Sequence, residues 1–225
     1  VVKATKGGQV KEFHNMVDYT TWKNTPESTG WNIKYYKGLG TSTSAEGKDY
    51  FRNIVKNTLT YVSDDNTMEY LSLAFEKSRA DDRKKWLTEN KVSFEPLEST
   101  LAKVSYKDFV NRELIQFSLT DNIRSIPSMV DGFKPSQRKV IYACFKKNLN
   151  KEMKVSQLSG YIAEYSAYHH GEVSLQGTII NMAQNYMGSN NCNYLEPIGQ
   201  FGTRLQGGKD SASARYISTR LSVVT

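Results

Sequence analysis

The sequence predicts an α+β protein, with a mixed α/β segment over residues 1–104 and a mainly helical segment over residues 105–225. Two observations carry this prediction. Trp31, Ile33 and Tyr35 alternate with polar neighbours, which is the period of a strand with one buried face. In the second segment the apolar residues recur every three or four positions, which is the spacing of amphipathic helices. With 225 residues, of which 38% are hydrophobic, the chain is long enough to bury a core.

The first segment begins with strands and continues with a helix. Residues 9–14 also predict a strand, and the glycine turn at residues 37–40 ends the strand around Ile33. A helix is expected after this turn, because Thr43 and Glu46 have the spacing of a capping box. Three apolar residues follow it at helical intervals: Phe51, Ile54 and Val55.

Two more helices and a linker complete this segment. Apolar residues at helical spacing predict one helix around residues 71–75 and another over residues 80–87. Residues 90–104 contain Pro96 and show no clear period, so we expect a linker there.

The second segment opens with two capped helices. Ser105 begins a helix whose apolar positions share one face, namely Val110, Leu114 and Phe117. Pro127 lies in the break after it, and Pro135 suits the first turn of the next helix. Four apolar residues of that helix are expected inside: Val140, Ile141, Cys144 and Phe145.

Two further helices and a hairpin-like segment follow. One helix is expected over residues 155–167, and the last carries a single apolar stripe of Leu175, Ile179, Met182 and Tyr186. Beyond Gly188 the chain is rich in Asn, Gly and Ser, which favours a loop or a short hairpin. Helix, short break, helix and hairpin is the order of a winged helix-turn-helix, which makes the last helix the expected recognition helix.

The charge pattern favours a polyanionic partner for the second segment. The chain carries 30 Lys and Arg against 23 Asp and Glu, a formal net charge of +7. Residues 1–104 contribute +2 and residues 105–225 contribute +5. A basic surface attracts nucleic acid, although a soluble basic protein without such a partner has the same composition.

The cysteines and the hydropathy pattern disfavour several classes of protein. Cys144 and Cys192 have neither a CxxC spacing nor a disulfide-rich context, which favours a reducing compartment. No apolar run approaches the roughly 20 residues of a membrane helix, and the N-terminus lacks a signal-peptide hydrophobic region. We therefore expect no membrane partner. The chain starts at Val1 without an initiator methionine, so we interpret it as an excerpt of a longer protein.

Arg215 and Tyr216 form the first candidate site. A free phenol has a pKa of about 10 and is a poor nucleophile near neutral pH unless a cation and a proton acceptor favour its phenolate. Arg215 supplies a neighbouring cation, as an enzyme needs when it joins itself covalently to a DNA phosphate. The chain has 14 tyrosines, and a half-buried packing residue is the ordinary alternative.

Two histidines stand together before the last predicted helix. His169 and His170 precede Gly171, and backbone N–H groups at a helix start attract phosphate. A histidine there donates to a phosphate oxygen or exchanges a proton near neutral pH, and a structural role is the alternative. Metal ligation needs a third partner at suitable spacing, which His14 does not offer, so we assign no metal ligand.

Other cations occupy positions that suit phosphate. Arg124 lies just before Pro127, and Arg138 lies in the helix that starts at Pro135; arginine forks match phosphate geometry. The remaining DNA-binding candidates are basic residues near these positions or in glycine-rich stretches: Lys134, Lys139, Arg204, Lys209 and, as a weaker candidate, Lys37. Taken singly, each is also explained as a solvated surface charge.

Together these segments resemble a eukaryotic-type type IIA DNA topoisomerase. Six motifs in order carry the resemblance over essentially the whole chain: residues 35–44 (YYKGLGTSTS), 121–139 (DNIRSIPSMVDGFKPSQRK), 168–172 (YHHGE), 188–191 (GSNN), 200–210 (QFGTRLQGGKD) and 214–217 (ARYI). The resemblance implies that residues 1–104 are the C-terminal part of a TOPRIM domain with its extension and linker. Residues 105–225 would be most of a winged-helix domain similar to that of the gyrase A protein, truncated at its C-terminal end.

The resemblance also implies residue roles. Tyr216 would attack the scissile phosphate and form a transient 5′-phosphotyrosyl link that allows duplex passage, and Arg215 would stabilise the phosphate charge. His170 would hydrogen-bond the phosphate or handle the tyrosine proton. Arg124 and Arg138 would hold the DNA backbone near the cut. An aryl phosphodiester is close in energy to the DNA phosphodiester that it replaces, so cleavage would be reversible.

Cofactors and partners follow from the resemblance as well. Enzymes of this family hold Mg²⁺ with acidic TOPRIM residues, which are expected upstream of Val1, and ATP in a separate domain. The partner would be double-stranded DNA, bound by a homodimer of the full-length protein. The compartment would be the nucleus, or the host cytoplasm or a viral factory for an enzyme of a large DNA virus.

Two other interpretations stay open on the residues alone. One is a winged-helix module that binds duplex DNA without cutting it, which the charge asymmetry and the order of the helices favour. The other is a basic interaction domain in which the motifs are coincidental. A covalent DNA adduct that depends on Tyr216 would separate the topoisomerase hypothesis from both.

Overall fold

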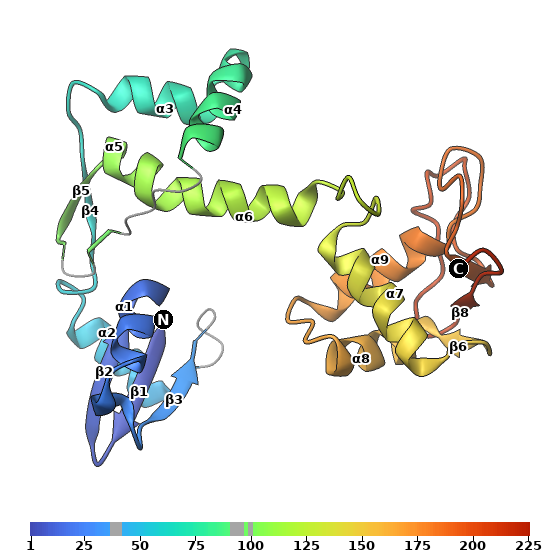
Figure 1. Ribbon diagram of the computed structural model, residues 1–225, viewed down its shortest axis with the longest axis horizontal. Helices are drawn as coiled ribbons and strands as arrows, with labels where there is room; N and C mark the ends of the chain where they lie inside the picture. Colours follow the sequence, from blue (N-terminus) through green and yellow to red (C-terminus); the bar gives the residue numbers. More distant parts are fainter. Residues whose placement is uncertain (37–41, 91–96, 99–100) are drawn as a thin grey trace. The chain divides into compact units, whose positions relative to one another are not determined.

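The computed structural model describes residues 1–36, 42–90, 97–98 and 101–225, coloured along the chain in Figure 1. The glycine turn expected at residues 37–40 lies outside the described residues. The chain forms two compact units, residues 1–120 (the N-terminal unit) and residues 121–225 (the C-terminal unit). This division lies downstream of the expected boundary at 104/105. The reason is packing, because Val110 and Ile115 share a buried cluster with Trp86.

The N-terminal unit opens with an antiparallel sheet of strand order β2-β1-β3. Its strands are β1 (Val2–Lys6), β2 (Gln9–Phe13) and β3 (Asn32–Tyr35), and β2 is joined to β3 by α1 (Met16–Lys23) and the 3₁₀ turn η1 (Pro26–Ser28). In the register of the sheet, Ala4 lies opposite Lys11 on one side and Ile33 on the other. Both strands that the sequence predicts here are confirmed.

Helix α2 (Ser44–Arg52) begins as expected and ends early. The capping box forms, because the Thr43 main-chain N–H donates to the Glu46 carboxylate at 2.7 Å and the Glu46 N–H donates to Thr43 Oγ1 at 3.3 Å. The Asn53 side chain then hydrogen-bonds Asp49, and an asparagine that bonds nearby backbone competes with further helix. Ile54 and Val55 therefore lie beyond the helix, and their helical interpretation is wrong.

The rest of the N-terminal unit is helical, with one added pair of strands. The two predicted helices are confirmed as α3 (Thr67–Phe75) and α4 (Ala80–Glu89), joined by the 3₁₀ turn η3 (Lys77–Arg79). β4 (Thr60–Val62) pairs in parallel with β5 (Lys103–Ser105), and this pairing buries Val104. The end of the segment expected as a linker is thus a strand.

A π-helical stretch changes which residues of the next helix are buried. Ser105 caps α5 (Tyr106–Asp108) as predicted, and the π-helix η4 (Phe109–Leu114) and α6 (Ile115–Ser125) follow. Val110 is buried, but Phe117 is 61% exposed and Ile115 is buried in its place. A π-helix forms its hydrogen bonds five residues apart, so it rotates the face of every residue after it. The expectation that Phe117 shares the buried face is wrong for this reason.

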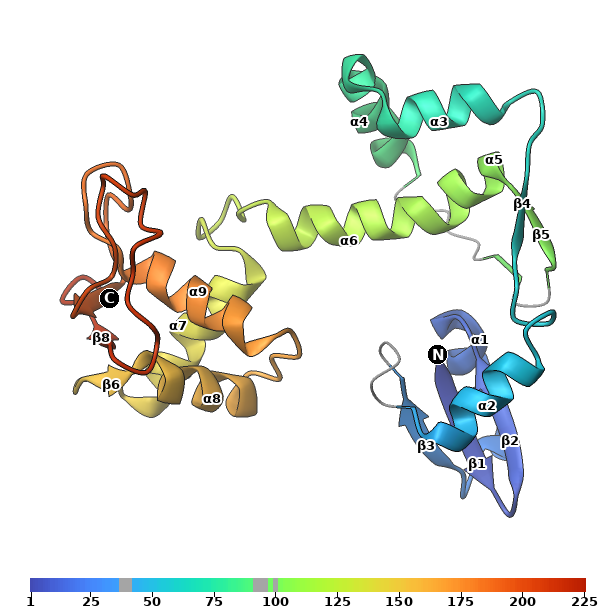
Figure 2. The same cartoon turned by 180° about the vertical axis from the view of Figure 1, so that it is seen from behind.

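The C-terminal unit has a winged helix-turn-helix order. Its helices α7 (Pro135–Lys147), α8 (Val155–Tyr165) and α9 (Glu172–Ala183) pack on one another. Beside them lies an antiparallel sheet of order β6-β8-β7 (Figures 1 and 2), made of β6 (Met153–Lys154), β7 (Leu195–Ile198) and β8 (Ser218–Leu221). The expected hairpin-like segment is therefore two paired strands joined by a long connection over residues 199–217.

One buried cluster joins these helices to the sheet. Its fully buried members include Val140, Cys144, Leu158, Ile162, Leu175, Ile179 and Leu195. Two expectations about it are wrong. Phe145 is 53% exposed, because Asn148 turns into the left-handed region (φ 51°) and brings Leu149 into the core instead. Tyr186 lies beyond α9, because Gln184 leaves the helical conformation at ψ 131°.

Candidate functional site

Arg215 and Tyr216 are displayed between two buried anchors. Ala214 and Ile217 are 7% and 2% exposed, whereas Tyr216 is 64% exposed. Gly199 permits close packing at the second anchor, because a Cβ there would lie 3.0 Å from Ile217 Cγ2. The short segment thus holds on at its ends and turns its two functional side chains outward.

The first turn of α8 fixes this segment through its backbone. The N–H groups of Val155 and Ser156 donate to the carbonyl oxygens of the two anchors, at 3.0 and 3.1 Å. These N–H groups have no acceptor inside their own helix, so the segment satisfies them. Lys154 Nζ adds a hydrogen bond of 3.1 Å to the main-chain oxygen of Tyr216. The backbone beside the phenol is therefore held on both sides.

The predicted pairing of a cation with the phenol is present. The guanidinium carbon of Arg215 lies 4.8 Å from the centre of the Tyr216 ring, within the range of a cation–π contact. Both side chains are exposed. A phosphate that approaches the phenol oxygen from solvent would meet the guanidinium charge beside it.

The two histidines lie in the bend before α9, as predicted. Their ring centroids are 4.3 Å apart, and both side chains are exposed. His169 Nδ1 lies 3.4 Å from the main-chain oxygen of Ala167, which also accepts a hydrogen bond of 3.1 Å from Lys139 Nζ. This shared acceptor brings the predicted DNA-binding residue Lys139 next to His169 and His170.

Both predicted backbone-holding arginines are paired with carboxylates. Arg124 Nη2 lies 2.5 Å from Asp121 Oδ1. Arg138 binds Asp131 through Nε at 2.6 Å and Nη2 at 2.9 Å. The Arg138 guanidinium, helped by the Phe133 main-chain N–H, lowers the pKa of Asp131 to about 2, and Asp131 in turn raises the pKa of Arg138. Both arginines are exposed and keep N–H groups that point away from these bonds.

Lys134 occupies the N-cap of α7, where its main-chain N–H receives the side-chain oxygen of Gln137 at 2.9 Å. Its side chain is half-buried beside the paired Arg138. Lys37 lies outside the described residues.

The glycine-rich basic stretch closes on itself. The Thr203 main-chain N–H and Oγ1 each donate to the Asp210 carboxylate at 2.8 Å, and these bonds lower the pKa of Asp210. Arg204 and Lys209 lie inside the closed loop, and both are exposed. Gln184 fastens the loop from beneath through its side-chain amide.

Four of these supporting residues escaped the sequence prediction. Asp131 and Asp210 stand inside the motifs but lack a local pattern that reveals their partners. Lys154 and Gln184 act on main-chain oxygens that lie 62 and 24 residues away, so no sequence spacing marks them. Their contacts appear only once the chain is folded.

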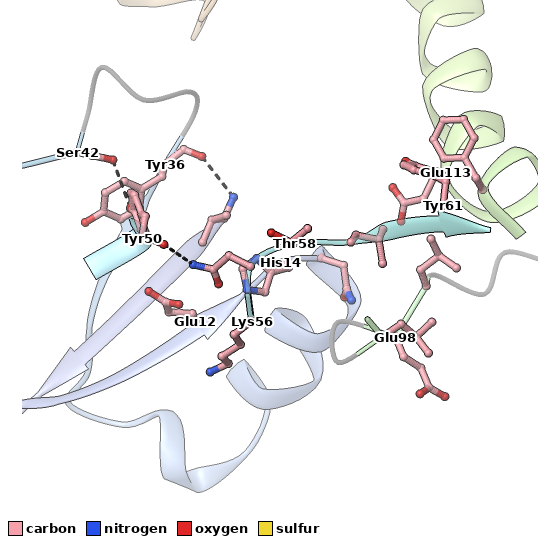
Figure 3. A pocket seen from close by; sticks show the side chains of 17 residues that line it. Glu12, His14, Tyr36, Ser42, Tyr50, Lys56, Thr58, Tyr61, Glu98 and Glu113 are labelled. Carbon is pink, nitrogen blue, oxygen red and sulfur yellow. Dashed lines mark hydrogen bonds between the residues drawn. The ribbon is translucent and has the colours of Figure 1, made fainter. Parts of the chain in front are cut away.

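A cavity of about 710 Å³ in the N-terminal unit is a separate feature (Figure 3). Its labelled lining includes Glu12, His14 and Tyr50, and the Tyr50 hydroxyl lies 3.3 Å from that of Ser42. The predicted cleavage residues instead lie in the C-terminal unit.

Two family models match the chain. Residues 1–122 match the C-terminal associated domain of TOPRIM, and residues 124–225 match the A chain family of DNA gyrase/topoisomerase IV. The two matches meet where the compact units divide. The chain belongs to the type II DNA topoisomerases. The expected TOPRIM part of this topoisomerase is thereby specified as the domain associated with the C-terminal side of TOPRIM.

Relatives of this topoisomerase agree. DNA topoisomerase 2 of Arabidopsis thaliana is 55% identical over 100% of this chain, and DNA topoisomerase 2 top-2 of Caenorhabditis elegans is 53% identical over 100% of it. The chain spans 16% of the length of each. A crystal structure of the DNA-binding, cleavage and re-ligation domain of Plasmodium falciparum topoisomerase II matches with a TM-score of 0.73 and 53% identity, over 98% of this chain and 30% of that one. The α+β fold class is confirmed.

Proposed function

We propose that this chain is a DNA cleavage and religation segment of an ATP-dependent type II topoisomerase. The observation that carries the proposal is the outward display of Arg215 and Tyr216 between two buried anchors. A packing tyrosine would turn its ring inward, whereas this ring is 64% exposed and its backbone is held by three hydrogen bonds from α8 and Lys154. Rigid backbone and open side chain are what a nucleophile on a large substrate needs.

In the proposed reaction Tyr216 Oη attacks the scissile phosphorus. The Oη–P bond forms, the bond from phosphorus to the 3′ oxygen breaks, and the phenol proton ends on that 3′ oxygen. Arg215 offsets the charge on the phosphate, and His170 hydrogen-bonds the phosphate or passes the proton. The product is a 5′-phosphotyrosyl link, an ester close in energy to the original one. The 3′ hydroxyl can therefore reverse the step after a second duplex has passed.

The proposed DNA contacts surround this residue pair. Arg124 and Arg138 hold the backbone near the cut, and the other cations extend the basic surface: Lys134, Lys139, His169, Arg204, Lys209 and Lys37. Phosphate contacts position DNA without reading its sequence. An enzyme that cuts at many sites is expected to rely on them and on DNA deformability.

The cofactors, the homodimer and the nuclear location are part of the same proposal. The portion of the chain that the structure describes holds no group of three His, Cys, Asp or Glu side chains suited to a metal ion. We therefore assign Mg²⁺ no ligand in this chain and route no step through it, and we place ATP in a separate domain. Among the described residues no helix is long and apolar enough to cross a membrane.

A trapping assay tests the proposal. Full-length enzyme is incubated with nicked duplex and Mg²⁺, quenched with SDS and examined for protein bound covalently to DNA. The adduct is expected with the unmodified enzyme and absent with Tyr216→Phe. Tyr142→Phe is the matched control, because Tyr142 is also exposed, at 53%, and lies on α7. An adduct that survives Tyr216→Phe refutes the proposal. Salt-sensitive duplex binding without any adduct would favour the non-catalytic winged-helix module.

A further inference from the structure

Gln184 is a buried amide at the point where α9 ends. It is 6% exposed and is the first residue after the helix, where the backbone turns to an extended conformation. Buried amides are retained where their donors and acceptor are satisfied. The partners of Gln184 therefore indicate what the residue holds in place.

The side chain bridges the two sides of the basic loop 200–210. Gln184 Nε2 donates to the main-chain oxygen of Phe201 at 2.9 Å and to that of Gly208 at 3.3 Å. These two oxygens belong to the beginning and the end of the loop. One amide group thus sets the spacing of both sides.

The glycines of the loop are matched to this bridge. A Cβ on Gly208 would lie 2.4 Å from Gln184 Nε2, and a Cβ on Gly202 would lie 2.6 Å from Gly208 Cα. Both glycines have positive φ, +79° and +100°. The loop approaches the amide and itself so closely that only residues without a side chain fit.

The backbone of Gln184 links a second motif to the same point. Its main-chain oxygen accepts hydrogen bonds from Asn190 Nδ2 at 2.8 Å and from Ser189 Oγ at 3.1 Å. Asn190 Nδ2 also donates to the Asn181 oxygen within α9 at 2.6 Å. Gln184 therefore joins the end of α9, the turn at residues 188–191 and the basic loop.

The loop that Gln184 holds carries two exposed cations and leads to the nucleophile. Arg204 and Lys209 lie within it, and Ala212 N–H donates to the Gln200 oxygen at 2.9 Å just before the segment that displays Tyr216. Cations that are already fixed lose less conformational freedom when they bind phosphate. We propose that Gln184 is a positioning residue that sets Arg204 and Lys209 against the DNA backbone beside the cut. This inference rests on the proposed function.

The test measures duplex affinity of the full-length enzyme at several salt concentrations. Gln184→Met keeps a long unbranched side chain and removes both donors. We expect it to weaken binding about three- to tenfold and to make the salt slope shallower by about 1 to 2, because up to two phosphate contacts are lost. Val140→Ala is the control: it removes buried volume from the same unit without touching the loop, so the melting temperature falls and the salt slope does not change.

A second arm separates positioning from general stability. In an Arg204→Ala/Lys209→Ala background, Gln184→Met should weaken binding less than about twofold, because contacting sites are not additive. Equal weakening in both backgrounds, or an unchanged salt slope, overturns the inference while leaving the Tyr216 adduct untouched. Gly208→Ala disturbs the same contact from the other side and should reproduce the slope change if Gln184→Met fails to fold. An unaltered affinity of the Arg204→Ala/Lys209→Ala enzyme would remove this loop from the proposed DNA contacts as well.

Discussion

The Arg138 guanidinium lies against the Asp131 carboxylate through two hydrogen bonds, of 2.6 and 2.9 Å. The Phe133 main-chain N–H donates to the same carboxylate at 3.0 Å, so the acid is itself held in place. This arrangement orients a guanidinium before DNA arrives. It also places a negative charge next to the position that a phosphate would take.

Asp131→Asn should strengthen duplex binding at low salt. The substitution removes the competing charge, so affinity should rise about two- to fivefold and the salt slope should steepen by up to about 1. Fluorescence anisotropy with a labelled duplex measures both. Glu152→Gln makes the same charge change at another exposed position of the C-terminal unit. If the two variants behave alike, the effect is overall charge and Asp131 has no local role.

Glu46 should make the N-terminal unit sensitive to acid. The Thr43 main-chain N–H and then the Tyr36 hydroxyl lower the pKa of Glu46 to about 2, whereas an unfolded glutamate titrates at about 4.3. A depressed pKa gives stability that is present above pH 4.3 or so and lost as pH falls through about 2. Thermal melts between pH 6 and pH 2 should show this loss. Glu46→Gln should flatten it and lower the melting temperature at pH 7, whereas Asp65→Asn, at an exposed acid of the same unit, should do neither.

Gly202→Ala should disrupt the basic loop. The new Cβ would lie 2.6 Å from Gly208 and would sit at φ +100°, so we expect a loss of about 2 to 3 kcal/mol in the free energy of unfolding. Gly207→Ala is the matched control, because Gly207 also has positive φ but has no atom within 4 Å of its Cβ position. Its cost should be only the left-handed backbone term of about 1 kcal/mol. Chemical denaturation compares the two, and equal losses would contradict the packing argument.

The two cysteines should differ in reactivity. Cys144 is fully buried, and burial raises the pKa of its thiol to about 12, whereas Cys192 is exposed. Because the thiolate is the reactive form, a thiol reagent at pH 8 should modify Cys192 and leave Cys144 intact until the protein unfolds. Mass spectrometry of the labelled chain gives the site. Rapid labelling of a Cys192→Ser variant under native conditions would show that the helical core opens readily.

Local patterns in the sequence predicted most of the elements. The alternation around Ile33, the capping box at Thr43 and the helix starts at Ser105 and Pro135 all appear as expected. Each signal is short-range, since it depends on residues within one or two turns of a helix or along one strand. The same is true of the ordered motifs, which identified the family and singled out Arg215 and Tyr216.

Tertiary packing decided what these patterns do not encode. Phe117 was expected inside and is exposed, because the preceding π-helix rotates the face of α6. The contacts that shape the site join Lys154 to Tyr216 across 62 residues and Gln184 to Gly208 across 24. Hydrophobic period and capping chemistry specify where elements begin and which side is apolar. Which buried amide meets which carbonyl depends on how those elements pack, and that is settled only by the three-dimensional fit of the whole unit.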